Sequence, residues 1–120
     1  MIIGDSEGQM DGFYAIYYTG VAGFGHAVLV LNSGAIAGAD VTGSTYDGQY
    51  SVNNGGSVHA EIVLTIPAGT TFVTGQTLPS PFSQTIKVDL SPGFANGEPV
   101  PIQTPLGPVN GIFKKLRDLP

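Results

Sequence analysis

The side chains that could do chemistry are few and scattered along the chain. Cysteine is absent, which removes a thiol nucleophile and any thiolate metal site. The only histidines are His26 and His59, and each lies beside apolar residues in a strand-like segment. Glu61 shares a strand face with His59, so a small metal site on this pair is one alternative, but two or three more ligands would be needed. We therefore interpret both histidines as polar strand positions and expect no metal.

Two carboxylates, Asp40 and Asp47, are the best candidates for acid–base catalysis. Such a pair needs environments that push the two pKa values apart. Asp40 is better explained as a hydrogen-bond acceptor in the turn at Thr42-Gly43, and Asp47 falls on the polar face of its strand. No Gly-x-Ser-x-Gly motif occurs, and the glycine clusters lack the strand–helix context of a phosphate or dinucleotide loop. We expect no catalytic residue, no cofactor and no enzyme.

The composition indicates one globular domain of low charge. The chain has 120 residues, of which 42% are hydrophobic and 11% are charged, and its net charge is −5. Lys114, Lys115 and Arg117 are three of its four cations and lie at the end, so most of the surface would repel a phosphate backbone. We expect no nucleic-acid binding, no membrane span and a cytoplasmic location. Residues 1–9 are interpreted as a flexible leader before one domain at 10–120.

Short strands and turns follow one another along the chain. Several segments alternate apolar and polar residues with period two, as strands with one buried face do. Asn53-Asn54-Gly55-Gly56 supplies the positive-φ residues that a tight hairpin needs. We predict strands at 13–18, 26–31, 35–41, 45–52, 57–66, 82–90 and 109–116, with a short one at 71–73.

Proline marks the one long interruption, at residues 91–108. Its five prolines cannot donate to a ladder, so we expect a loop with at most a short edge strand near 100–103, or a single helical turn near 91–97. No segment has the periodicity of a long helix. Short strands with frequent turns predict an all-β sandwich or barrel, and the short hairpin links favour an antiparallel up-and-down β-barrel of about eight strands.

The alternation also predicts which side chains face the barrel interior. The apolar face of three strands supplies this set, and small residues at 34–39 would leave room inside for a ligand. The predicted interior residues are Tyr46, Tyr50, Val58, Ile62, Leu64, Ile86 and Val88.

Segments 13–18 and 27–31 are apolar on both faces. One face would be covered by the barrel interior and the other by a second subunit, so we expect a homodimer. A helix or the 91–108 loop covering that face is the alternative. The predicted dimer or partner surface consists of Tyr14, Ile16, Tyr18, Val28 and Val30.

Three short motifs, in this order and spacing, resemble the GrlR-like family, which includes a negative regulator of type III secretion. They are Asp11-Gly12-Phe13-Tyr14; His26-Ala27-Val28-Leu29-Val30 with Asn32-Ser33-Gly34 and Ala37-Gly38-Ala39-Asp40; and Tyr46-Asp47-Gly48-Gln49-Tyr50. The resemblance covers about residues 10–66. It implies a lipocalin-like barrel, a homodimer, and regulation by binding a transcriptional activator without touching DNA.

Two functions therefore remain open. The first is a non-catalytic dimeric regulator of the GrlR-like type that acts through protein–protein contacts. The alternative is a carrier or sensor of a small apolar ligand held inside the barrel.

Overall fold

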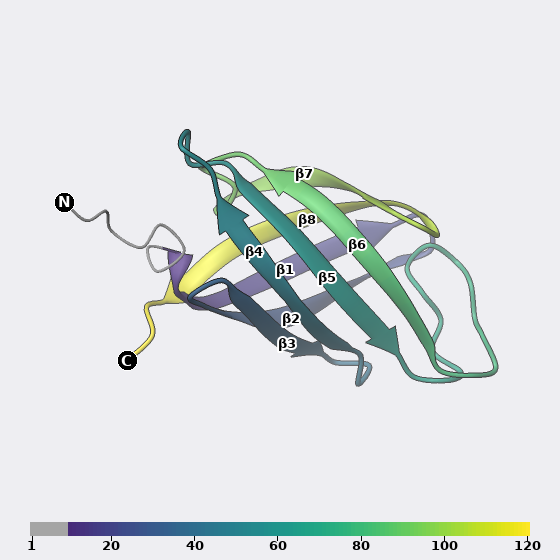
Figure 1. Ribbon diagram of the computed structural model, residues 1–120. Coiled ribbons are helices and arrows are strands. Elements are labelled where there is room, and N and C mark those ends of the chain that lie inside the picture. Colours follow the sequence, from purple (N-terminus) through teal and green to yellow (C-terminus); the bar gives the residue numbers. More distant parts are fainter. Residues whose placement is uncertain (1–9) are drawn as a thin grey trace.

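The computed structural model describes residues 10–120, which form eight antiparallel strands wrapped around one interior (Figure 1). The predicted leader at 1–9 lies outside the described residues. Residues 10–120 contain no α-helix, so none of them forms a helix that could cross a membrane. The strands are β1 (Gly12–Gly20), β2 (Gly23–Asn32), β3 (Ala35–Asp40), β4 (Thr45–Val52), β5 (Val58–Ile66), β6 (Phe82–Leu90), β7 (Asn96–Thr104) and β8 (Gly107–Arg117).

The strands form one sheet that curls until it almost closes. Its order is β6-β5-β4-β3-β2-β1-β8-β7, so chain neighbours pair and β1 also pairs with β8. The two sheet edges, β6 and β7, come together without a ladder between them. The predicted all-β, antiparallel up-and-down barrel is therefore confirmed, with a seam between β6 and β7.

The proline-rich segment is more ordered than the sequence indicated. β7 is nine residues long, whereas only 100–103 was expected as a short edge strand. Pro99 and Pro101 are tolerated because β7 is an edge strand that pairs only with β8. Residues 91–94 form a single turn, in which Phe94 N donates to Ser91 O at 3.0 Å. The strand predicted at 71–73 is wrong, because this segment contributes only an isolated bridge between Thr71 and Thr77.

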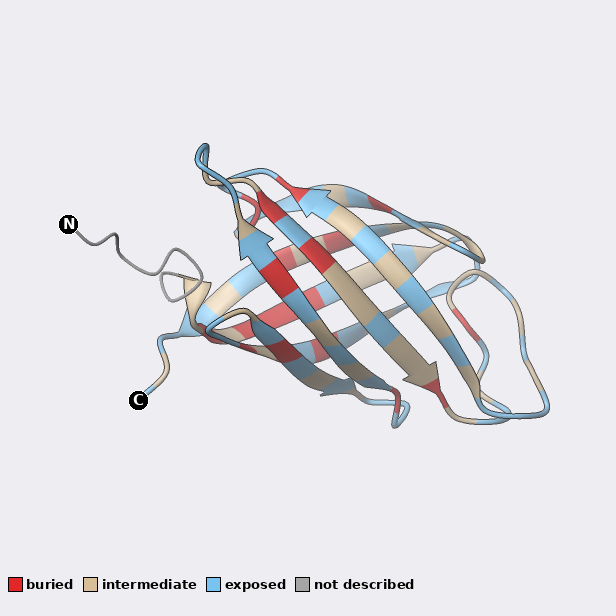
Figure 2. Ribbon diagram, viewed as in Figure 1, coloured by how far each residue is buried: buried red, intermediate tan, exposed pale blue. Residues whose placement is uncertain are grey.

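The predicted interior face of β4, β5 and β6 is confirmed by burial, and Figure 2 shows buried and exposed positions alternating along the strands. Tyr50 and Val58 are 5% and 1% exposed. The partly buried members of the set pack against this core or line the cavity described below: Tyr46, Ile62, Leu64, Ile86 and Val88.

The face assigned to β1 is wrong. Tyr14 and Ile16 are buried in the core, at 3% and 8% exposed, and Tyr18 faces the interior, so none of the three belongs to an outer surface. The register aligns Tyr14 with Leu29 and Ile16 with Ala27, both of which point inward. Both faces of residues 13–18 are apolar, so this part of β1 contains no charged or small polar residue that marks the outside.

The outer positions of the neighbouring strands fit the prediction better. Val28 is 47% exposed and Val30 is partly exposed, because β2 buries the alternate residues. On β1 the face opposite to Tyr14 carries Phe13, Ala15 and Tyr17, of which Tyr17 is 52% exposed and Ala15 is buried at 7%. The apolar outer face that the sequence indicated therefore exists on β1 and β2. On β1 it is formed by residues 13, 15 and 17, whereas 14, 16 and 18 were predicted.

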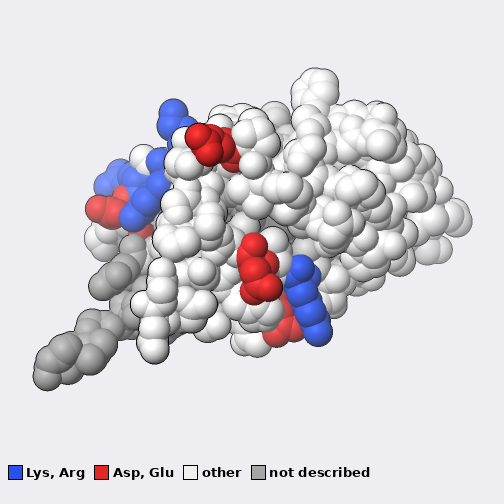
Figure 3. Space-filling model, turned by 90° about the horizontal axis from the view of Figure 1, so that it is seen from above, with Lys and Arg blue, Asp and Glu red and all other residues white. Residues whose placement is uncertain are grey.

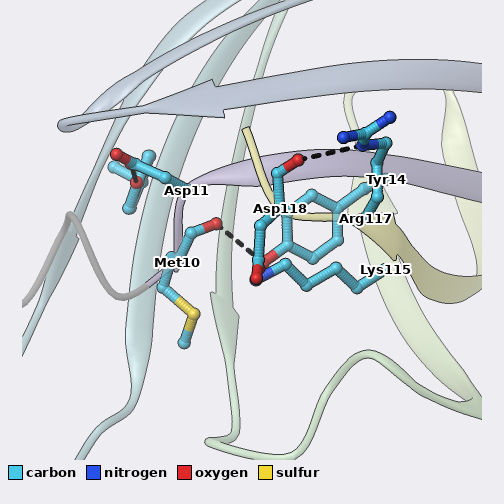
Figure 4. Close-up of polar contacts among 7 residues, drawn as sticks. Met10, Asp11, Tyr14, Lys115, Arg117 and Asp118 are labelled. Carbon is cyan, nitrogen blue, oxygen red and sulfur yellow. Dashed lines mark hydrogen bonds and ion pairs between the residues drawn. The ribbon is translucent and has the colours of Figure 1, made fainter. Parts of the chain in front are cut away.

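Aromatic rings close the barrel end that lies near the termini. The Tyr14 ring stacks on Phe94 at 6.2 Å, and Phe94 meets Phe113 edge-on at 5.3 Å. The Tyr14 hydroxyl donates to Met10 O at 2.7 Å, and Lys115 Nζ lies 2.6 Å from Asp118 Oδ1 (Figure 4). Side chains fill most of this end, so the larger open space lies toward the other end.

Candidate ligand-binding cavity

The interior contains an apolar cavity of about 180 Å³ in the half away from the termini. Ile62, Leu64, Ile86 and Val88 of β5 and β6 form much of its wall. A smaller cavity of about 40 Å³ lies next to the rings of Tyr14, Phe94 and Phe113. It shares wall residues, including Ile62, with the first cavity. The larger cavity therefore lies in the half away from the termini, and only the smaller one reaches the end near the termini.

Glycines on the inner faces of β2 and β3 let neighbouring side chains lie directly over the backbone. The Tyr18 ring lies over Gly25, where a Cβ atom would come within 2.5 Å of the ring carbon Cζ. Gly38 is paired with Tyr46, and a Cβ there would meet Leu29 Cδ2 at 2.6 Å. The small-residue run at 34–39 was expected to open the interior. Its alanines are exposed on the outside and Leu29 covers Gly38, so this run does not line the larger cavity.

A carboxylate lies at the polar edge of the cavity. Asp40, the last residue of β3, accepts hydrogen bonds from the Tyr18 and Tyr46 hydroxyls at Oδ2, at 3.0 and 3.2 Å. Its Oδ1 accepts from Thr42 N at 2.9 Å, Thr42 Oγ1 at 2.6 Å and Ser44 N at 3.2 Å. The predicted role of Asp40 in the turn is confirmed, but its two tyrosine partners were missed because β1 had been given the wrong face.

Burial and the charge of Asp40 keep both phenols protonated. Burial, then the nearby Asp40 charge, raises the pKa of Tyr18 to about 12. Burial also raises the pKa of Tyr46, with Tyr18 and Asp40 adding to the effect. Both hydroxyls therefore act as donors to Asp40 over the physiological pH range. No Lys, Arg or His forms an ion pair with Asp40 among residues 10–120.

A second polar group in the cavity is the amide of Gln84 on β6. Its Oε1 is buried and has no hydrogen-bond partner within the described structure. The registers place Gln84 beside Leu64 and Leu64 beside Tyr46, so all three belong to one cross-strand row of the inner face. A buried acceptor without a partner costs free energy and requires an explanation. The sequence did contain a signal, because Gln84 is the one polar residue on the apolar face of this strand.

The long loop between β5 and β6, residues 67–81, lies across the cavity mouth, where it appears green in Figure 1. Val73 O accepts from Ala22 N of the β1–β2 turn at 2.7 Å. Gln76 Nε2 donates to Leu106 O of the β7–β8 turn at 3.3 Å. Phe72 is buried, with its ring 5.9 Å from that of Phe82. The loop is therefore attached to two other turns and covers the cavity.

Exposed apolar side chains lie on the turns around the same mouth. Val21, Phe24 and Val41 are 86%, 82% and 70% exposed, and the last two also line the cavity. In Figure 3 the charged residues lie over the half near the termini and along one side, whereas the end that carries the mouth is white. The approach to the cavity is thus apolar and weakly charged.

The other sites considered from the sequence do not assemble. His59 Nδ1 lies 2.7 Å from Asp89 Oδ1, and Glu61 pairs with Lys87 at 3.6 Å, so these groups form separate exposed pairs on β5 and β6. Asp47 is exposed on β4 and lies on the face opposite to Tyr46. Across residues 10–120, no group of three His, Asp or Glu residues is placed to hold a metal ion.

In comparisons with protein-family models, curated proteins and solved structures, nothing matches this chain. The resemblance to the GrlR-like family therefore stays a prediction. Function has to be argued from the cavity and from the outer face of the barrel.

Proposed function

We propose that this protein is a carrier or sensor that binds a small, mostly apolar ligand inside the barrel. The observation that carries the proposal is the cavity of about 180 Å³ with an apolar wall and a covering loop. An engineered apolar cavity of about 150 Å³ is enough to bind benzene. Small-molecule sites in proteins share this form, an apolar hollow with a few polar groups that fix orientation.

The free energy available from such a site is moderate. Each buried methylene contributes about 0.8 kcal/mol, so about six buried carbons give about 5 kcal/mol. One hydrogen bond to Gln84 Oε1 adds about 1 kcal/mol. A total near 6 kcal/mol corresponds to a Kd of tens of micromolar, in the range between about 1 μM and 1 mM. Ligand binding of this strength suits a carrier or sensor that must also release its ligand.

Native mass spectrometry tests the proposal directly. We expect the purified protein to carry an adduct that organic extraction removes, or to take up 1-octanol saturably after extraction. Leu64→Trp, which fills the cavity, is expected to abolish binding, whereas Val63→Trp on the outer face of the same strand is the matched control. Circular dichroism verifies that both variants are folded. Octanol binding that is absent from the wild type, or unchanged in a folded Leu64→Trp variant, contradicts the proposal.

A second candidate function, a dimeric regulator, is supported by the outer face of β1, β2 and β3. Tyr17 and Val28 are about half exposed there, Ala39 is exposed beside Val28, and these strands carry no charged side chain on that face. A second copy of the chain fits this surface because each copy carries a net charge of −5, and an uncharged face lets two copies meet without opposing their acids. The resemblance to the GrlR-like family adds a transcriptional activator as the further partner of such a regulator. The cytoplasmic location expected from the sequence belongs to the same proposal.

Sedimentation velocity tests this second candidate. Val28→Glu is expected to convert a dimer into a monomer, because it places a desolvated charge in the contact. Val63→Glu, at a site of similar exposure on β5, serves as the control. A wild-type monomer, or a dimer that survives Val28→Glu, rules out this interface.

A further inference from the structure

We propose that the ligand has a polar head that donates hydrogen bonds, either an ammonium group or an uncharged donor, and that this head binds beside Asp40, Tyr18 and Tyr46. Alkyl carboxylates are then excluded. This inference rests on the proposed function, because it specifies the chemistry of a ligand in the same cavity.

The polar groups of the cavity offer acceptors. The Tyr18 and Tyr46 hydroxyls both donate to Asp40 Oδ2, so neither proton is left for a ligand and each hydroxyl can only accept from one. Gln84 also lines the cavity, and its buried Oε1, which has no partner in the described structure, would accept from a donor that reaches it. A ligand whose polar head can only accept hydrogen bonds would leave these groups unsatisfied, at a cost for each.

The charge of the cavity points the same way. Asp40 brings one negative charge, and dipoles of hydroxyl and N–H groups are its described partners. Every Lys and Arg of the chain lies elsewhere, with Lys87 paired to Glu61 on the outside and the others at 114, 115 and 117. An ammonium head would supply the missing opposite charge, whereas a carboxylate head would place two like charges together in an apolar surrounding.

The turn alone does not account for the geometry of Asp40. Stabilisation of the β3–β4 turn uses Oδ1, which accepts from Thr42 and Ser44. Oδ2 plays no part in that turn and is directed at two tyrosines whose side chains line the cavity. Oδ1 of Asp40 therefore stabilises the turn, whereas Oδ2 holds the two tyrosines on the cavity wall.

Isothermal titration of the extracted full chain with n-octylamine, 1-octanol and octanoate at neutral pH tests the inference. These probes share one apolar tail, so differences in Kd report on the head group. Because a hydrogen bond to a charged group is worth about 1.5–3 kcal/mol, we expect octylamine to bind roughly 10- to 100-fold more tightly than octanol. Octanoate is expected to bind more weakly than octanol.

Two variants locate the effect. Asp40→Asn is expected to remove most of the preference for the amine while octanol still binds, and Asp47→Asn removes the same charge from the outer face and is expected to keep the preference. The wild-type series decides the question even where Asp40→Asn does not fold. Octanoate that binds as tightly as octylamine, or an amine preference that survives Asp40→Asn, overturns this inference and leaves the proposed function standing. Failure of all three probes to bind overturns the proposed function itself.

Discussion

The contacts of Asp40 predict a large stability loss when its carboxylate is removed. In Asp40→Ala the Tyr18 and Tyr46 hydroxyls lose their common acceptor in a partly buried setting, and the backbone N–H groups of Thr42 and Ser44 lose theirs in the turn. The turn amide of Thr42 is exposed and regains water, so the two tyrosines dominate the cost.

The magnitude follows from those two hydrogen bonds. A hydrogen bond to a charged acceptor contributes about 1.5–3 kcal/mol, so removing both costs about 3–6 kcal/mol. That is a large share of the stability of a small domain, which is typically about 5–15 kcal/mol. Asp47→Ala removes an exposed carboxylate one strand away and is expected to change the free energy of unfolding by less than about 0.5 kcal/mol.

Urea unfolding followed by far-ultraviolet circular dichroism measures both variants. A mutant cycle shows whether the two hydroxyls cause the loss of stability. When Asp40→Ala is made in a Tyr18→Phe, Tyr46→Phe background, no tyrosine hydroxyl is left there without an acceptor. We expect most of the cost of about 3–6 kcal/mol to disappear in that background, because neither hydroxyl is present there to lose its acceptor. If Asp40→Ala costs no more than Asp47→Ala, or if its cost is the same in both backgrounds, the hydrogen-bonded cluster does not exist as described.

Three further predictions follow from the same structure. The free energy of unfolding is expected to fall as pH rises from about 10 to 12. The reason is that Tyr18 has a pKa of 10.0 in the unfolded chain and about 12 in the folded one, so the unfolded chain releases the proton first. In urea titrations at several pH values, Tyr18→Phe should make this fall smaller. Gly48→Ala is expected to cost more than about 1 kcal/mol, because its Cβ would meet the β5 backbone at Ile62 Cα, 2.8 Å away, whereas Gly23→Ala meets nothing within 4 Å and should be neutral or stabilising. Phe72→Ala is expected to loosen the covering loop and speed hydrogen exchange of the Ala22 amide, and unchanged exchange would show that the loop does not depend on Phe72.

The fold was largely readable from the sequence where polar residues marked one face. In 57–66 and 82–90 one face carries nearly all the apolar side chains, with Val63 the exception, and the buried Val58 and partly buried Ile86 follow that pattern. In 13–18 both faces are apolar, so periodicity did not distinguish Tyr14 from Phe13. The burial of Tyr14 depends instead on register with β2 and on Phe94, a residue far along the chain.

The candidate site was less predictable because its parts come together through closure of the barrel. Asp40 was identified as a turn acceptor, and that local role holds. Its bonds to Tyr18 and Tyr46 join three strands and require the correct face of β1. Residues 67–81 were expected to contain a short strand at 71–73 between loops, and their attachment to the β1–β2 and β7–β8 turns is a tertiary contact that no local pattern encodes.

The most direct test of a ligand-binding interior is a methyl-detected NMR titration of the extracted protein with 1-octanol. We expect saturable shifts at Leu64 and Ile86, which line the larger cavity, and small ones at Val63, which lies on the outer face. Shifts that are absent, that never saturate, or that are as large at Val63 as at Leu64 would contradict a ligand site inside this barrel.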